Sequence, residues 1–241
     1  AIHKLKEAST LFREGETKAG TVLLEEVQSL PSPDVVNVAI GVLDEMEGVV
    51  QQAQSPGEDV PFVSVIAGAV HAQYFACRVL RVSLIRDWRT YWENESESIV
   101  SYLQKYLSDY ANVLALGCSS ALLAEMCLVH SVIWKLLWGN AGDSVLETVA
   151  GTLESLIQCG EEGGVELAIV GRTLAQTTVE EFGLYHPASQ SRGLTLSQHE
   201  KCRRSFEDLV LLNLSRCILT TIWGVSDNSM ENEKSCLVLI R

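Results

Sequence analysis

Residues 61–88 read PFVSVIAGAVHAQYFACRVLRVSLIRDW, and this stretch decides the fold class. Its apolar residues recur every three or four positions, which places them along one face of a helix. They are Phe62, Ile66, Val70, Cys77, Leu80, Leu84 and Trp88. His71, Arg78 and Arg86 project from the opposite side. Because a helix with one apolar face packs that face against a neighbour, we expect Trp88 to be largely buried.

The same pattern of helix, turn and helix continues on both sides of this stretch. The second helix of successive pairs ends near Leu30, Trp88, Trp138 and Phe182, and HEAT-type hairpins repeat at about 40–47 residues. We therefore expect an all-α fold, an α-solenoid of stacked HEAT-type helical hairpins, in which residues 1–241 form an N-terminal segment. The expected hairpins cover residues 1–30, 32–88, 96–138, 144–183 and, incompletely, 197–241.

Local signals predict where individual helices begin. Ser32-Pro33-Asp34 indicates a helix start with Ser32 as the cap, and this helix is expected to run to about Gly48, before a loop at 51–59. Residues 112–138 are expected to form one long apolar helix, followed by a glycine-rich break at 139–142. Ser144-x-x-Glu147 and Ser197-x-x-Glu200 have the capping-box pattern.

One further helix, 144–159, has a predicted inner face. Val145, Val149, Leu153 and Leu156 are expected to point inward. Glu147 and Glu154 are expected to point outward.

Charge and composition exclude several classes of function. The chain of 241 residues has 18 Lys+Arg against 31 Asp+Glu, a net charge of −13, which favours basic partners over nucleic acid or anionic membranes. The uncharged runs 60–77 and 111–124 are interpreted as buried helices, without membrane insertion. Seven cysteines without a short repeating spacing indicate a reducing compartment, and the first residues lack a secretory signal.

Motifs for catalysis or metal binding are not found in the sequence. Adjacent carboxylates such as Glu180-Glu181 point about 100° apart on a helix, so they do not face each other for acid–base chemistry. Cys127-x-x-His130 and His199-x-x-Cys202 each supply two of the four ligands of a structural zinc site. We interpret them as packed cysteines and solvent-edge histidines, and we expect no enzymatic activity, cofactor or metal.

Three stretches resemble the N-terminal part of nuclear transport receptors of the importin-β superfamily. SLIRDW (83–88) is similar to the Arg-acidic-Trp end of a hairpin's second helix in that family, and SIVSYLQKYLSDY (98–110) to the amphipathic helix after it. GLTLSQHEKCRRSFEDL (193–209) resembles the family's Gly-Leu-Ser…His…Cys-Lys-Arg…Phe stretch. The agreement in order, from about residue 1 to 225, is strongest with the exportin-4 branch, and the exportin-7 branch comes second. The 48–58 loop and the 139–142 turn depart from the pattern, as in a divergent member.

The resemblance implies a receptor that binds Ran-GTP and protein cargo, passes nuclear pore proteins and shuttles between nucleus and cytoplasm. The exportin-4 branch implies a cargo such as the hypusine-bearing translation factor 5A. In the family the inner helices of the first hairpins contact Ran, and by position these are about 17–30, 61–88 and 112–138 here.

Arg78 and Arg81 are the best candidates for the Ran contact, because arginines on an acidic chain suit bidentate pairing with carboxylates. Glu25, Gln28 and Glu125 are weaker candidates, chosen by position alone. Two alternatives stay open. The cluster Arg78, Arg81, Arg86 and Arg89 could be structural and pair with acidic neighbours such as Asp87 and Glu93. The chain could also be a HEAT-repeat scaffold subunit of another complex, whereas an all-α enzyme is disfavoured for lack of carboxylate-rich metal motifs.

Overall fold

The computed structural model describes residues 1–54, 62–162, 164–183 and 194–223, and it confirms the all-α class. Every regular element within these residues is helical, and none of them is a strand. The chain divides into two compact units, Ala1–Ile133 and Trp134–Arg241, and the boundary between them falls inside a helix.

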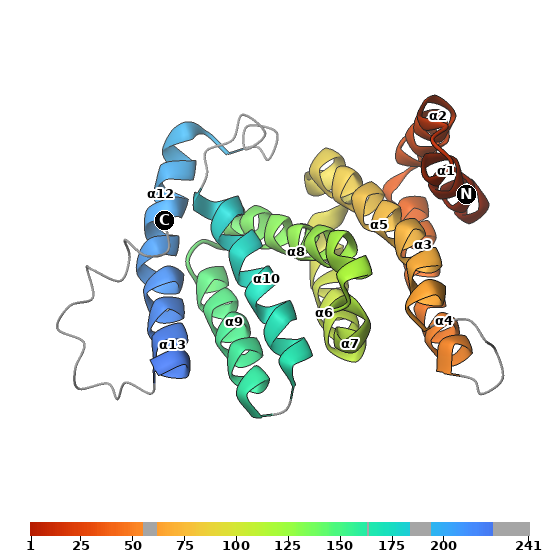
Figure 1. The fold of residues 1–241 in the computed structure, drawn as a ribbon. Helices are drawn as coiled ribbons and strands as arrows, with labels where there is room; N and C mark the ends of the chain where they lie inside the picture. The colour runs from red at the N-terminus through yellow and green to blue at the C-terminus, as the bar shows by residue number, and fades with distance from the viewer. Residues whose placement is uncertain (55–61, 163, 184–193, 224–241) are drawn as a thin grey trace. The chain divides into compact units, whose positions relative to one another are not determined.

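The first unit is built around one long helix, α5 (Phe62–Asp87), which contacts the four helices that precede it in the chain (Figure 1). α1 and α2 pack against each other, both contact α5, and α3 packs along α5. The elements are α1 (Ile2–Arg13), α2 (Thr17–Gln28), α3 (Ser32–Leu43), α4 (Glu45–Gln54), α5 (Phe62–Asp87), the π-helical turn η1 (Trp88–Trp92), α6 (Glu93–Asp109), α7 (Ala111–Leu114), the 3-10 turn η2 (Gly117–Ser119) and the first part of α8 (Ser120–Ala141).

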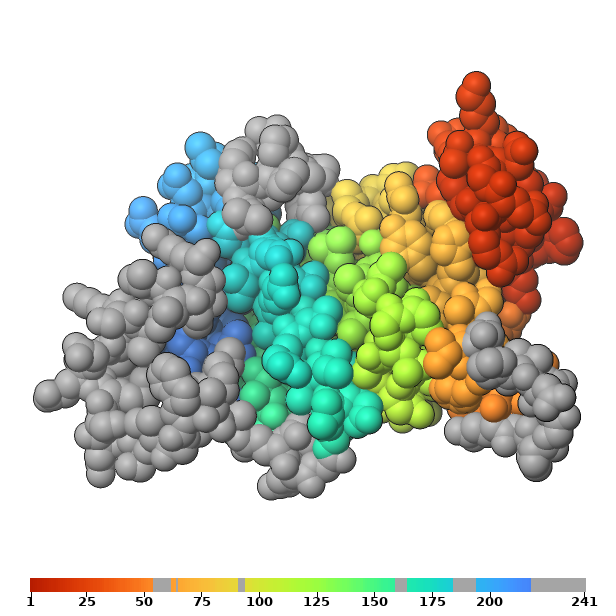
Figure 2. Space-filling view, in the orientation of Figure 1, coloured from red at the N-terminus to blue at the C-terminus, as the bar shows by residue number. Residues whose placement is uncertain are grey.

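The second unit contains the end of α8 and two further helical segments. α9 (Ser144–Glu162) and α10 (Val165–Gly183) form a closely packed pair, and Figure 2 shows α10 at the surface in front of α9. The next segment consists of α12 (Leu196–Phe206), the π-helical turn η3 (Glu207–Leu211) and α13 (Leu212–Trp223). Its first part contacts α10 and its later parts contact α9, so the segment packs on both helices of the preceding pair.

The expected apolar face of α5 is confirmed. Ile66, Val70, Cys77, Leu80 and Leu84 are all buried, and Trp88, just past the end of the helix, is only 7% exposed. Phe62 is half-buried. This one helix therefore supplies core residues along most of its length, as its sequence pattern predicts.

The start of α3 differs from the prediction. Pro31, not Ser32, is the N-cap, and Ser32 is the first helical residue. The Ser32 hydroxyl is hydrogen-bonded to the side chains of Ser83 and Asp87 on α5, so it joins two helices instead of capping one. α3 also ends at Leu43, and α4 extends through residues 51–54 of the expected loop. The rest of that loop, 55–59, lies outside the described residues.

The apolar stretch 112–138 is not one helix, because α7, η2 and α8 divide it. α8 ends at Ala141, and the next residue, Gly142, has a φ of 69°, in the left-handed region that favours glycine. The stretch Gly117–Ala141 is long and apolar enough to cross a membrane, but most of it is buried inside the protein. The core helix of a soluble protein has the same length and composition.

Neither predicted capping box forms as expected. Ser144 is the first residue of α9, and its hydroxyl donates to the carbonyl oxygen of Ala141. The capping box of α12 consists of Thr195 and Gln198, two residues before the Ser197–Glu200 pair. Gln198 N donates to Thr195 Oγ1 at 3.2 Å, and Thr195 N donates to Gln198 Oε1 at 2.9 Å.

The inner face of α9 is rotated from the expected one. Val149 and Leu153 are buried as predicted, but Val145 and Leu156 are only half-buried, and so is Glu154. Leu146, Ala150 and Ile157 complete the buried face. The expected partial helix near Met230 lies outside the described residues.

Candidate functional site

The four arginines of the cluster on α5 and η1 have different environments. Arg78 and Arg89 are exposed, and the Arg81 side chain is 23% exposed. Arg86 is also exposed, although it makes several hydrogen bonds. The cluster is therefore not one uniform basic surface.

Arg81 and Glu125 form an ion pair with each other. Arg81 Nε donates to Glu125 Oε1 at 2.6 Å, across from α5 to α8, and the Glu125 side chain is only 8% exposed. Two candidate residues that lie 44 positions apart in the sequence are thus brought together. A carboxylate this buried depends on its arginine partner, so the pair has a structural role in holding α8 to α5.

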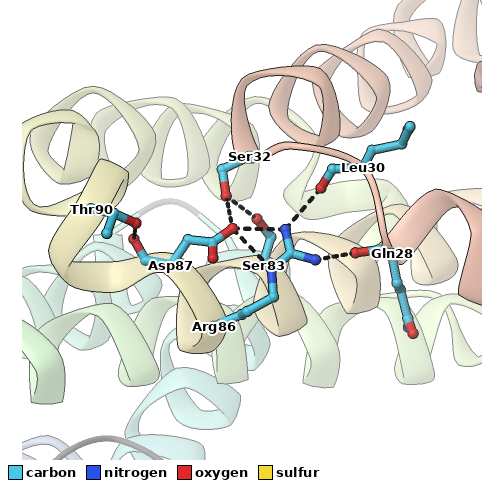
Figure 3. Close-up of polar contacts among 7 residues, drawn as sticks. All are labelled: Gln28, Leu30, Ser32, Ser83, Arg86, Asp87 and Thr90. Atoms are coloured by element: carbon cyan, nitrogen blue, oxygen red, sulfur yellow. Dashed lines mark hydrogen bonds and ion pairs between the residues drawn. The ribbon is translucent and has the colours of Figure 1, made fainter.

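Arg86 binds the end of α2 (Figure 3). Its guanidinium donates to the carbonyl oxygens of Gln28 and Leu30, and it is also hydrogen-bonded to Asp87 Oδ2 through Nε at 2.9 Å and Nη2 at 2.7 Å. Carbonyls at a helix C-terminus lack intrahelical donors, and a cation there also complements the helix dipole. The candidate Gln28 therefore contributes a backbone carbonyl to a structural contact.

Asp87 lies at the centre of the same network (Figure 3). Its Oδ2 accepts a hydrogen bond from Ser32 Oγ at 2.5 Å. The Oγ atoms of Ser32 and Ser83 are hydrogen-bonded to each other at 2.7 Å. The hydrogen bond from Arg86 is the main cause that lowers the pKa of Asp87, and the bond from Ser32 acts in the same direction. The network joins the α2–α3 turn to the last turn of α5.

The two remaining candidates, Arg78 on α5 and Glu25 on α2, are both exposed. Within the described part of the chain, no hydrogen bond or ion pair joins either of them to another candidate. Arg78 and Glu25 are thus the predicted residues that stay available to a partner.

The expectation of solvent-edge histidines is wrong. His130 is fully buried in α8 and His199 is 2% exposed in α12, and Cys127 and Cys202 are buried beside them. Burial lowers the pKa of His130 from 6.5 to about 4, and it raises the pKa of the Cys127 thiol. In the ranges that the structure describes, no three His, Cys, Asp or Glu side chains come together as a metal site would need.

A cleft between the start of α4 and the second half of α6 was not predicted from the sequence. Its volume is about 660 Å³, and it is lined by Asp44, Glu47, Tyr102, Lys105, Tyr106, Asp109 and Tyr110. The sequence signal was present, since the three tyrosines recur at intervals of four residues and so share one helix face. The acidic residues that face them lie more than fifty residues earlier, which local spacing does not reveal.

Comparisons with protein-family models, with curated proteins and with solved structures found no significant match to this chain.

Proposed function

We propose that this chain is the N-terminal segment of an exportin-type nuclear transport receptor, in which helical hairpins stack as a HEAT-type α-solenoid and bind Ran-GTP and protein cargo. The observation that carries the proposal is the packing order. The principal contacts join helices of the same hairpin or of the next one along the chain, which is typical of helical-repeat proteins. The resemblance of three ordered stretches to the importin-β superfamily supplies the partners.

The proposed receptor acts by binding and not by covalent chemistry. Ran-GTP and cargo would each raise the affinity for the other, because both favour the same curved state of the solenoid. Passage through the nuclear pore, and a cargo such as translation factor 5A, belong to the same proposal.

Arg78 is the proposed contact residue on α5, with Glu25 on α2 as the second. Both are exposed, whereas Arg81, Gln28 and Glu125 take part in contacts within the chain. A guanidinium offers five N–H donors in a planar fork, so Arg78 suits a carboxylate of the partner.

The experiment measures binding of the chain to immobilised Ran loaded with GTP or with GDP. We expect binding to the GTP form only. Arg78→Ala should slow association by about two- to fivefold, more at low salt, because it removes one charge at the rim of an interface. Arg172→Ala is the matched control, since Arg172 is an exposed arginine on α10.

Two results would contradict the proposal. Equal binding to both nucleotide forms, or to neither, would remove the receptor function and favour the alternative of a HEAT-repeat scaffold. Unchanged association of Arg78→Ala with Ran-GTP would place the contact elsewhere on the chain. Circular dichroism of each variant checks that its helicity is that of the parent.

A further inference from the structure

The cleft between α4 and α6 combines aromatic rings with carboxylates. Tyr102 Oη of α6 donates to Asp44 Oδ1, in the turn between α3 and α4, at 2.8 Å across the cleft. Its volume of about 660 Å³ falls within the range of about 300–1,000 Å³ that is usual for ligand sites. All of its lining residues belong to the first unit.

The tyrosine rings contact one another, and the hydroxyls of Tyr102 and Tyr106 are hydrogen-bonded. The ring centroids are 6.4 Å apart for Tyr102 and Tyr106, and 4.7 Å apart for Tyr106 and Tyr110. Tyr106 is buried, and its hydroxyl donates to Gln73 Oε1 of α5 at 2.9 Å. Tyr102 and Tyr110 are half-buried, so their rings are the ones that face solvent in the cleft. The surface they form is therefore preorganised.

The charge of the cleft is negative. Asp44, Glu47 and Asp109 are exposed carboxylates, and Lys105 is the cation in the lining. Burial raises the pKa of Tyr110, and the charges of Glu47, Asp109 and Asp44 raise it further, so all three carboxylates act on this ring. Negative carboxylates beside aromatic faces favour a cation, because each attracts positive charge.

We propose that this cleft binds an arginine side chain from a basic segment of a partner protein. A guanidinium stacks on a tyrosine face and pairs with a carboxylate through two parallel hydrogen bonds, whereas an ammonium group offers only a point charge. Tyr102 and Tyr110 supply the faces, and Glu47 and Asp109 supply the carboxylates. None of the arginines of α5 is among the residues that line the cleft, so the test does not depend on Ran.

The experiment follows the tyrosines directly while a defined probe is added. The chain is labelled with 3-fluorotyrosine, and a short oligoarginine peptide is titrated against it by ¹⁹F NMR, with Tyr→Phe variants assigning the signals. The same peptide with citrulline in place of arginine is the neutral comparison. We expect the signals of Tyr102 and Tyr110 to shift with the arginine peptide and to stay unchanged with the citrulline peptide.

Charge-matched variants distinguish binding in this cleft from non-specific attraction of the peptide to an acidic chain. Glu47→Gln with Asp109→Asn should weaken the peptide's affinity by about three- to tenfold. Glu14→Gln with Glu16→Gln removes the same charge from exposed positions in the α1–α2 turn, and should change the affinity by less than about twofold. Lys105→Gln should strengthen binding by about two- to fivefold.

Three outcomes would overturn the proposal. The first is that both double variants weaken the peptide's affinity equally. The second is that the arginine peptide binds without shifting the signals of Tyr102 and Tyr110. The third is that an oligolysine peptide binds as tightly as oligoarginine. Circular dichroism and thermal melting that match the parent establish that each variant is folded.

Discussion

At the scale of single residues, Arg81 has a structural role because it pairs with the buried Glu125, whereas Arg78 is exposed. Arg81→Met should lower the free energy of unfolding by about 1–3 kcal/mol, because it leaves a buried carboxylate without its partner. The double variant Arg81→Met, Glu125→Leu should recover most of that loss, since a well-packed apolar pair often replaces a buried ion pair without cost. Urea unfolding followed by circular dichroism measures both changes.

Arg78→Met is the control for this comparison. Arg78 is exposed on the same helix, so its removal should change the free energy of unfolding by less than about 0.5 kcal/mol. Equal losses for Arg78→Met and Arg81→Met would contradict the assignment of a structural role to Arg81 alone.

At the scale of elements, two glycines in one helix pair should respond to the same substitution with opposite signs. A Cβ at Gly171 of α10 would lie 3.1 Å from Leu156 Cβ and 3.2 Å from the Leu156 carbonyl carbon, so Gly171→Ala should destabilise the pair by about 1–3 kcal/mol. A Cβ at Gly151 of α9 would meet no atom within 4 Å, so Gly151→Ala should stabilise the helix by up to about 1 kcal/mol. Thermal melting of the two variants distinguishes them, and a shift in the same direction for both would refute the close packing at Gly171.

The helices also show which local features could be predicted from the sequence. The apolar stripe of α5 was predicted because seven positions repeat with the helical period and outweigh any single exception. The helix caps could not be predicted in the same way. Thr195–Gln198 and Ser197–Glu200 lie two positions apart, and both pairs have residue types that suit a capping box. On α9, Val145 and Leu146 are adjacent apolar residues, and only packing against α10 and α13 decides that Leu146 is the buried one.

At the scale of the whole molecule, the all-α class followed from periodicity, but contacts between distant residues did not. The class could be predicted because apolar residues recur with the helical period along most of the described chain. The pairing of Arg81 with Glu125, and the acidic residues opposite the α6 tyrosines, depend on how helices approach in space. A single sequence holds no signal for such approaches, so these parts of the site required the structure.

Acid should destabilise the fold through His130. This side chain is fully buried, and its pKa falls from 6.5 to about 4 because burial disfavours the charged form. The unfolded chain binds the proton first, so the stability that His130 contributes is complete above about pH 6.5 and is lost as the pH falls towards 4. Between pH 7 and pH 4, the free energy of unfolding should fall by about 2–3 kcal/mol more in the parent than in His130→Leu.

The measurement is the free energy of unfolding in urea at a series of pH values. His3→Leu, which replaces a histidine on the exposed end of α1, is measured beside His130→Leu as the comparison variant. A parallel profile for His130→Leu would instead show that this histidine does not respond to acid in the folded state.

The bond from Arg86 to the end of α2 has a consequence for the time course of synthesis. α1 and α2 can pair as soon as both have left the ribosome, since their contacts are local. The carbonyl oxygen of Gln28, however, accepts its hydrogen bond from Arg86, which lies 58 residues further along the chain. At about 5–20 residues per second, that interval lasts roughly 3–12 s. During translation, the α1–α2 pair can therefore form before Arg86 is available to bind the end of α2. In these seconds the carbonyl oxygens of Gln28 and Leu30 lack the Arg86 donor, and a chaperone could bind the turn at residues 29–31.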